Sequence, residues 1–421
     1  MVGLDDIVIS GIGCVTPIGI GREALRQSLL GGRSGTRVVF HASSTGRVLY
    51  GAPIENFDGK DYVTPRKALK LMGRDVQLSY AAAHLAWEDA GLSDSTIDPN
   101  RVGVVFGSEI IPTEVEEVIS VVRSCSTGPD MDSSRWGSEF SKGIFPLWML
   151  RYLPNMPPCH VAIAIDARGP NNTIAMEEVS GLLALSEAIG IMQRGDADMM
   201  VVGAIGSRVT PTRLAFRMPG LFLETESPLE PDTNHCRPFE MRRGGIVPSE
   251  AAVVLIVERR RSAVARKARI YGQVRSVVSR FGRPRQHLTG SSVAIAQAAT
   301  AAMRLAGVCA EDLACVSAQG YSQSALDQTE AVAISQFAPN TPVSAYSSYL
   351  GTAGAASSLL QLASAILATS SGQVLPIAGF SQADPACPVQ VCQQKQATQQ
   401  RVLLQLGFTY HGAAAATIVE C

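Results

Sequence analysis

Two adjacent carboxylates, Glu177 and Glu178, end a turn that leads directly into a predicted helix. The turn covers residues 169–181, and residues 180–194 then place apolar side chains at helical spacing. The N-terminus of a helix stabilises an anion, whereas a neighbouring like charge opposes ionisation. A carboxylate at this place can act as a general base, or it can be a buried polar side chain that fills an inactive pocket.

The composition limits the class of protein. The chain has 421 residues, of which 46% are apolar, and this is enough for two large α/β units. Its 36 basic and 37 acidic residues nearly cancel, which argues against a nucleic-acid partner. No apolar run reaches the roughly 18–20 residues that a membrane helix needs, and the first residues do not follow the pattern of a secretion signal. We therefore expect a cytoplasmic protein that does not bind a membrane.

Nine cysteines are scattered along the chain without Cys-x-x-Cys spacing. In a cytoplasmic protein, scattered cysteines are usually small, buried, apolar side chains. We therefore expect neither disulfides nor a metal site.

Strands and helices alternate along the chain, which predicts a mostly parallel sheet covered on both faces. Strands are expected at residues 7–10 and 102–107, with a helix at residues 81–90. The helix at residues 180–194 is followed by Gly195, a typical left-handed cap, and by a strand. A second helix, at residues 352–369, is followed by the same arrangement, which predicts two similar halves that divide near residues 260–269.

Six segments, in the right order over nearly the whole chain, resemble the elongating β-ketoacyl synthases, the condensing enzymes of fatty-acid and polyketide assembly. They are Ile7–Gly19; Asn155-Met156 with His160 and Arg168-Gly169-Pro170; Gly195–Asp198; Arg237-Pro238-Phe239 with Arg243, Gly245 and Glu250; Gly351 with Ala353-Gly354-Ala355; and Gly407-Phe408.

The resemblance implies an α/β fold of the thiolase-like type, with two similar halves in a five-layered α-β-α-β-α arrangement. The first half, residues 1–260, carries the turn at Glu178, and the second covers residues 261–421. It also implies an acyl thioester on the phosphopantetheine arm of an acyl carrier protein as the ligand, a dimer as the assembly, and no tightly held cofactor.

Four positions depart from the family at the site of chemistry. Glu178 occupies the place of the nucleophilic cysteine. Gln319 and Ser348 occupy the places of the two histidines that stabilise the developing oxyanion, and Val343 replaces the lysine. Because all four are replaced together, we expect no condensation by this chain alone.

Three functions remain compatible with these replacements. The first is a chain-length-factor-like subunit that pairs with an active ketosynthase, in which Ile110 contacts the end of the partner's tunnel or packs in the interface. The second is a repurposed enzyme on acyl thioesters, with Glu178 as the general base and Gln319 and Ser348 as its polar partners. The third is a structural homodimer that binds acyl chains or a carrier protein without chemistry.

Two further groups of residues are candidates for binding. Phe408 in the gating turn and the neighbouring His411 are expected to line the acyl pocket. A set of basic side chains at helical spacing could contact an acidic carrier protein, although such a face is more often only solvated. This set is Arg66, Lys67, Lys70 and Arg74.

Overall fold

A computed structural model describes residues 6–42, 47–92, 97–210, 212–213, 221–225 and 234–421. Its centre is an 11-stranded sheet in the order β14-β13-β17-β18-β12-β1-β11-β9-β5-β8, with the short β2 (Gly19–Ile20) paired to β1. The first half supplies β1 (Ile7–Thr16), β5 (Val102–Gly107), β8 (Asn171–Ile174), β9 (Met199–Ser207) and β11 (Glu250–Arg259). The second half supplies β12 (Gly272–Phe281), β13 (Leu313–Ser317), β14 (Val343–Ser344), β17 (Val402–Phe408) and β18 (Ala413–Glu420).

The two halves repeat one topology. In each, the five strands taken in chain order lie in the order third, second, fourth, fifth, first. In each, the second strand is parallel to both of its neighbours, and the fifth is antiparallel to the fourth and to the first. The halves join where β1 pairs with β12 over two residue pairs. The domain boundary at residue 260 remains a proposal, and α8 (Arg260–Ala265) lies at this place.

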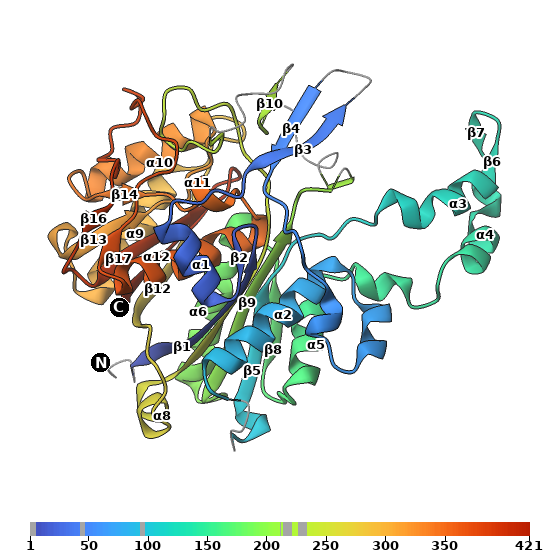
Figure 1. Ribbon diagram of the computed structural model, residues 1–421, viewed down its shortest axis with the longest axis horizontal. Coiled ribbons are helices and arrows are strands. Elements are labelled where there is room, and N and C mark those ends of the chain that lie inside the picture. The colour runs from blue at the N-terminus through green and yellow to red at the C-terminus, as the bar shows by residue number, and fades with distance from the viewer. Residues whose placement is uncertain (1–5, 43–46, 93–96, 211, 214–220, 226–233) are drawn as a thin grey trace.

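Helices cover the sheet in three layers (Figure 1). α2 (Arg74–Asp89) and α5 (Met156–Ala164) pack on the outer face of the first half. α9 (Ser292–Ala306) covers the outer face of the second half, and α10 (Ser324–Phe337) packs on α9. α6 (Ser180–Arg194) and α12 (Ser357–Ser370) pack on each other and contact strands of both halves. The layers therefore alternate as α-β-α-β-α.

Two expectations about the strands were wrong. The predicted mostly parallel sheet is mixed, since antiparallel pairs join β1, β9, β11 and β12 and also β17 and β18. The first strand does not end at residue 10 but continues to Thr16 with a bulge between Ile9 and Gly11. Gly13 lies inside this strand. A larger residue would not fit there, because a Cβ atom would lie 2.0 Å from the carbonyl oxygen of Ala82 in α2. The glycine permits close packing of helix on strand.

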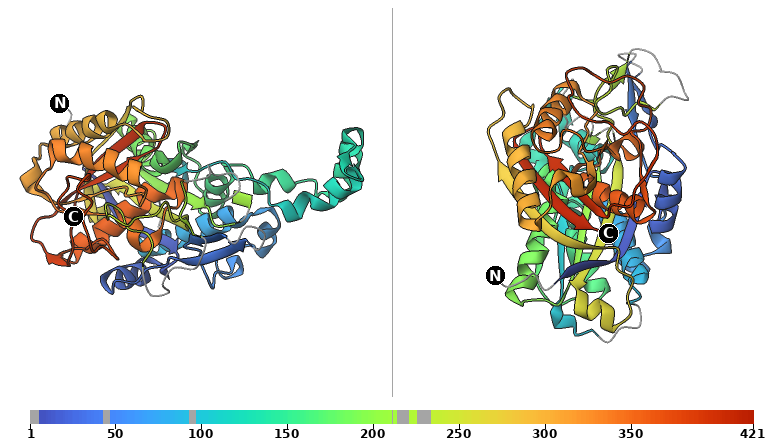
Figure 2. Two further views of the ribbon diagram at one scale, coloured as in Figure 1. Left: turned by 90° about the horizontal axis from the view of Figure 1, so that it is seen from above. Right: turned by 90° about the vertical axis from the view of Figure 1, so that its left-hand side faces the viewer.

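An arm extends from the first half, away from the body (Figures 1 and 2). It contains α3 (Val115–Cys125), the hairpin β6 (Ser126–Thr127) and β7 (Asp130–Met131), and α4 (Trp136–Gly143). A small apolar cluster of its own, centred on Val121, Cys125 and Ile144, holds the arm together. Shorter elements elsewhere are α1 (Arg22–Leu30), α11 (Ser347–Leu350), β3 (Arg37–Ala42), β4 (Arg47–Gly51), β10 (Glu224–Thr225), β15 (Gln373–Val374) and β16 (Gln396–Ala397).

Candidate functional site

The turn that carries Glu178 lies between β8 and α6, at the carboxyl end of three neighbouring parallel strands. Glu177 has φ +50°, in the left-handed region that a residue with a side chain rarely adopts. Ser180 holds the turn, because its hydroxyl donates to the Glu177 carbonyl oxygen at 2.6 Å and accepts from the Met176 N–H at 2.8 Å. The two carboxylates point into different surroundings: Glu178 is buried, whereas Glu177 lies near the exposed His411.

Glu178 is one member of a buried ion triad. Its Oε1 accepts a hydrogen bond from Nη1 of Arg208, which follows β9 directly. The other edge of the Arg208 guanidinium donates to Glu109, from Nη2 to Oε2 at 2.7 Å and from Nε to Oε2 at 3.0 Å. The exposed fractions of the Arg208, Glu109 and Glu178 side chains are 4%, 8% and 1%. A cation therefore bridges two anions at the position expected for the nucleophile.

The electrostatics of the triad favour its charged form. Burial alone would lower the pKa of Arg208, but the two carboxylates raise it well above its ordinary value. The guanidinium is tightly packed against Gly354. A Cβ atom at this position would lie 2.4 Å from Nε of Arg208 and 2.5 Å from Oε2 of Glu109. Gly354 also has φ +53°, so both the backbone and the space require glycine. Oε2 of Glu178 has no hydrogen-bond partner among the described residues.

Gln319, at the position expected for the first histidine, follows β13 and is buried. Its backbone N–H and that of Gly320 donate to the two carboxylate oxygens of Glu330, at 2.7 and 2.9 Å. Its backbone carbonyl oxygen accepts from the Gln361 side chain at 2.9 Å. Neither polar atom of the Gln319 side chain has a partner in the described part of the chain. The backbone here is fixed, and the amide group is free to bind another group.

Ser348 and Val343, at the positions expected for the second histidine and the lysine, contribute to the structure of the second half. The Ser348 hydroxyl donates to the Ala345 carbonyl oxygen at 2.7 Å and accepts from the Ala378 N–H at 3.0 Å. Val343 is buried in β14, where it pairs with Val316. The serine proton is thus committed to the backbone, and the valine side chain belongs to the hydrophobic core.

Phe408, the residue expected in the gating turn, is fully buried at the end of β17. Its ring lies edge-on to that of Tyr321, with 5.0 Å between centroids, and the Tyr321 hydroxyl donates to the Phe408 carbonyl oxygen. Burial, followed by the charge of Glu178, raises the pKa of Tyr321 well above its ordinary value, so the phenol remains protonated. Tyr321 and Phe408 form a packed pair beside the triad.

His411 lies outside this packed pair. It is exposed, and its Nε2 is 3.5 Å from Oε1 of Glu177. Tyr410 shares the same carboxylate through its hydroxyl, and burial together with Glu178 and Glu177 raises the pKa of this phenol. His411 and Tyr410 therefore surround the outward-facing carboxylate of the turn.

The remaining predicted residues lie on the surface. Ile110, next to Glu109, is 82% exposed. The four basic residues do not share one helix: Arg66, Lys67 and Lys70 are exposed on the 3₁₀ helix Arg66–Leu71, and Arg74 begins α2. Arg74 is already paired, since Nε and Nη2 donate to Glu250 at 2.6 and 2.9 Å. Helical spacing failed here because Met72 and Gly73 are extended between the two elements.

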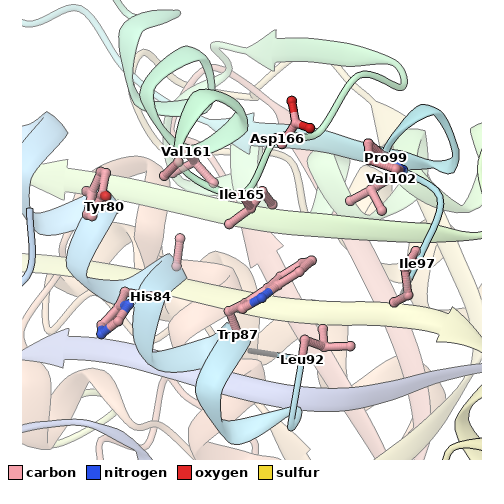
Figure 3. Close-up of a pocket in the computed structure, with 12 residues that line it drawn as sticks. Tyr80, His84, Trp87, Leu92, Ile97, Pro99, Val102, Val161, Ile165 and Asp166 are labelled. Carbon is pink, nitrogen blue, oxygen red and sulfur yellow. The ribbon is translucent and has the colours of Figure 1, made fainter. Parts of the chain in front are cut away.

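A pocket of about 510 Å³ lies far from this turn, on the outer face of the first half (Figure 3). It is lined by Trp87 of α2, by Val161 of α5 and by Ile165, which follows α5. Val102, at the opposite end of β5 from Glu109, also lines it. Over the described residues, no group of three or more His, Cys, Asp or Glu side chains is arranged for a metal ion. Over the same residues, no helix is long and apolar enough to span a bilayer.

Arg208 and Glu109 are site residues that the sequence analysis missed. Each follows a buried strand, and β9 and β5 are parallel neighbours, so their carboxyl ends meet at one edge of the sheet. A charged residue within two positions of the end of each of two adjacent apolar strands was the signal that could have revealed the pair.

Two family models match most of the chain. The family model described as the β-ketoacyl synthase N-terminal domain matches residues 4–263, and the one described as the C-terminal domain matches residues 271–381. The ketoacyl synthase alpha subunit of the tetracenomycin polyketide synthase from Streptomyces glaucescens is 28% identical, over 98% of this chain and 96% of its own length. The 3-oxoacyl-[acyl-carrier-protein] synthase 2 of Synechocystis is 28% identical, over 90% of this chain and 89% of its own length.

Among solved structures, the ishigamide ketosynthase/chain length factor superposes with a TM-score of 0.83 and 24% identity, over 99% of this chain and 98% of that chain. The predicted thiolase-like fold with two similar halves is confirmed by this likeness and by the two matching domains.

Proposed function

The chain belongs to the β-ketoacyl synthase family, and we propose from this premise that it is a non-condensing member, a chain-length-factor-like subunit in fatty-acid or polyketide-type synthesis. In this role it pairs with a cysteine-bearing ketosynthase and helps to shape the partner's acyl tunnel. The observation that carries the proposal is the buried triad of Glu109, Arg208 and Glu178.

The triad is incompatible with the covalent step of condensation. That step needs a nucleophile that holds the acyl group as a thioester. A carboxylate that attacked a thioester would form an acyl anhydride, which is more reactive than the thioester it replaces. Glu178 is also bonded to Arg208, and removal of either charge would leave the other buried without its partner.

This chain also has fewer hydrogen-bond donors for the oxyanion that forms during decarboxylation. The Ser348 proton is committed to a backbone carbonyl oxygen, and Val343 has no proton to donate. Only the Gln319 amide is free, and a single neutral donor offers less stabilisation than several preorganised ones.

A second candidate function has one observation in its favour. Oε2 of Glu178 and the Gln319 amide are both buried and unpartnered among the described residues, so a general base with an amide partner stays open as a repurposed activity on acyl thioesters. The Arg208 bond to Oε1 weighs against it, because one oxygen of the carboxylate is already occupied by the guanidinium.

The surface supports pairing with a second subunit of the same fold. β8 is an edge strand in the described sheet, and the arm next to it carries large exposed apolar side chains. Those on the arm and beside β8 are Ile110, Val115, Met131, Phe145, Leu147, Met149, Ile163 and Met176. Such a surface suits either a cysteine-bearing partner or, in the structural alternative, a second copy of this chain. The carrier protein of the active partner would supply the acyl chain, with Arg66, Lys67 and Lys70 as candidate contacts.

The test is reconstitution with and without a partner. The chain is co-expressed with an intact ketosynthase from the same cells, and the pair is purified and supplied with malonyl carrier protein. We expect product only from the pair, and none when the partner's cysteine is replaced by alanine.

An Ile110→Trp variant should shorten the product, and Val115→Trp is its matched control on the same surface. Product from this chain alone that Glu178→Gln abolishes would establish the general-base alternative, and a stable homodimer that captures no ketosynthase would establish the structural one.

A further inference from the structure

The pocket of about 510 Å³ on the outer face of the first half is lined by residues of α2 and of α5 (Figure 3). Four residues of α2 line it at positions i, i+3, i+4 and i+7, so they share one face of this helix. They are Tyr80, Ala83, His84 and Trp87. On the α5 side the pocket is lined by Val161, Ala164 and Ile165. Its volume lies in the range of small-molecule sites.

The space between the two helices follows from their lengths and from two small side chains. α2 has 16 residues and α5 has 9, so α5 cannot cover the whole length of α2. α5 ends at Ala164, and Asp166 has φ +53°, a conformation that a right-handed helix does not include. Ala83 and Ala164 each contribute only a methyl group to the lining. The pocket is therefore built into the local sequence of both helices.

The ionisable groups at this pocket already have partners within the protein. Both carboxylate oxygens of Asp166 accept hydrogen bonds from Arg168, at 3.0 and 2.8 Å. Nε2 of His84 is 3.3 Å from Oε1 of Glu88. A ligand in this pocket therefore needs no net charge, and the remaining lining is mostly apolar.

One hydrogen-bond donor of the lining is not used. Trp87 is half-buried, and its indole N–H has no partner among the described residues. The Tyr80 hydroxyl, by contrast, donates to the Thr64 carbonyl oxygen at 3.1 Å. A buried indole N–H usually has a hydrogen-bond partner, because a buried donor without one costs free energy. A ligand that covers the Trp87 ring must therefore supply an acceptor.

We propose that this pocket binds a neutral, mostly apolar small molecule that has a rigid ring system and one carbonyl or ether oxygen. The oxygen accepts from the Trp87 indole N–H, and the ring system packs against apolar side chains that include Val161 and Ile165. A rigid ring system suits the site because it loses little conformational freedom on binding. The site is independent of the proposed function, since none of the described residues that line it belongs to the triad or to the turn of Glu178.

The test uses the full chain and two probes, 2-acetylnaphthalene and 2-ethylnaphthalene, of which only the first has a carbonyl group. Equilibrium dialysis gives a dissociation constant for each probe, and the ratio of the two constants is compared between variants, which cancels the different solubilities of the probes. Trp87→Phe keeps an aromatic ring but removes the donor, so the ratio should shift against the ketone by about 3- to 10-fold. Trp136→Phe is the matched control and should keep the ratio, because Trp136 packs on Phe140 in the arm and does not line this pocket.

A second pair of variants tests where the probes bind. Ala164→Phe places a ring at the pocket and should weaken binding of both probes by about tenfold or more. Ala265→Phe is the control, because Ala265, like Ala164, is exposed and is the last residue of a short helix. Equal binding by these two variants would place the probes elsewhere and overturn the site. An unchanged ratio in Trp87→Phe, or the same shift in Trp136→Phe, would overturn it as well.

Discussion

Nη1 of Arg208 donates a hydrogen bond to Oε1 of Glu178, and both side chains are almost completely buried. Arg208 also holds Glu109, so the three groups carry one net negative charge inside the protein. Charges at this depth persist only when they are paired and hydrogen-bonded. The position expected for the nucleophile is here part of an internal ion network.

Arg208 is expected to be essential for stability. Arg208→Met leaves two buried carboxylates without their cation, which should lower the free energy of unfolding by about 3–5 kcal/mol. Urea denaturation followed by circular dichroism measures the change. Arg101→Met is the control, because its pair with Asp198 is 35% and 46% exposed, so its loss should change the free energy of unfolding far less. Equal losses in the two variants would contradict a structural role for the triad.

Gly354 is expected to tolerate no side chain. Gly354→Ala places a Cβ atom 2.4 Å from Nε of Arg208, at φ +53°, so the triad must move. Gly195→Ala is the matched control, because Gly195 has φ +79° and open space around its Cβ position. The control should lose about 1 kcal/mol from backbone strain alone, and Gly354→Ala should lose about 1–3 kcal/mol more from the clash. Similar unfolding midpoints for the two variants would show that the triad has room to adjust.

A cysteine alone is not expected to restore condensation. Glu178→Cys supplies a thiol, but the Ser348 proton is committed to the Ala345 carbonyl oxygen and Val343 has no proton to donate to a developing oxyanion. Mass spectrometry of reactions with acyl and malonyl carrier proteins should find no β-ketoacyl product from the variant or from the unmodified chain. A β-ketoacyl product from Glu178→Cys would show that Gln319 and its surroundings suffice for decarboxylation.

The fold was predictable because its signals are spread over the whole chain. Six segments in the right order predicted the thiolase-like halves, and Gly195 adopts the left-handed cap expected of it, with φ +79°. The direction of the strands was not predictable from the alternation of strands and helices along the chain. Antiparallel pairs such as β11 with β9 depend on the path of the connecting segments, which the hydrophobic pattern does not show.

The candidate site was only partly predictable, for a related reason. Glu178 was found from a local turn, but its partner lies 30 residues away and is brought near by the order of β9, β5 and β8. Glu109, the neighbour of Ile110, was not predicted, because its partner Arg208 lies 99 residues further along the chain. The Ser348 hydroxyl bonds to the carbonyl oxygen of Ala345 and to the N–H of Ala378, which is 30 residues away in the chain. No pattern in the sequence predicts the second of these contacts.

Stability should decrease as the pH rises from acidic to mildly alkaline values. Burial raises the pKa of Glu330 from its ordinary 4.5 to about 8, and that of Asp327 from 3.8 to about 7. The folded state therefore binds these protons more tightly than the unfolded state does. Their contribution is complete below the ordinary pKa values and is lost as the pH rises through about 7 and 8.

Glu330→Gln tests the pH dependence, because glutamine does not titrate. Its free energy of unfolding, measured in urea at several pH values between 5 and 8.5, should fall less steeply with pH than that of the unmodified chain. The exposed Glu116→Gln should keep the original slope. An unchanged slope in Glu330→Gln would show that Glu330 is ionised in the folded protein, despite its burial.

The exposed apolar side chains beside the arm should be required for subunit pairing. Ile163 is 78% exposed on α5 and Met149 is 59% exposed at the base of the arm. An aspartate at either position would have to be desolvated in an interface, so Ile163→Asp and Met149→Asp should each weaken association by about tenfold or more. Analytical ultracentrifugation of the chain, alone and mixed with a ketosynthase, measures the effect.

Leu305→Asp is the control, since Leu305 is 66% exposed on α9, in the outer layer of the other half. If Leu305→Asp disrupts the assembly and the other two variants do not, subunits pair through the second half, and the arm must have another partner.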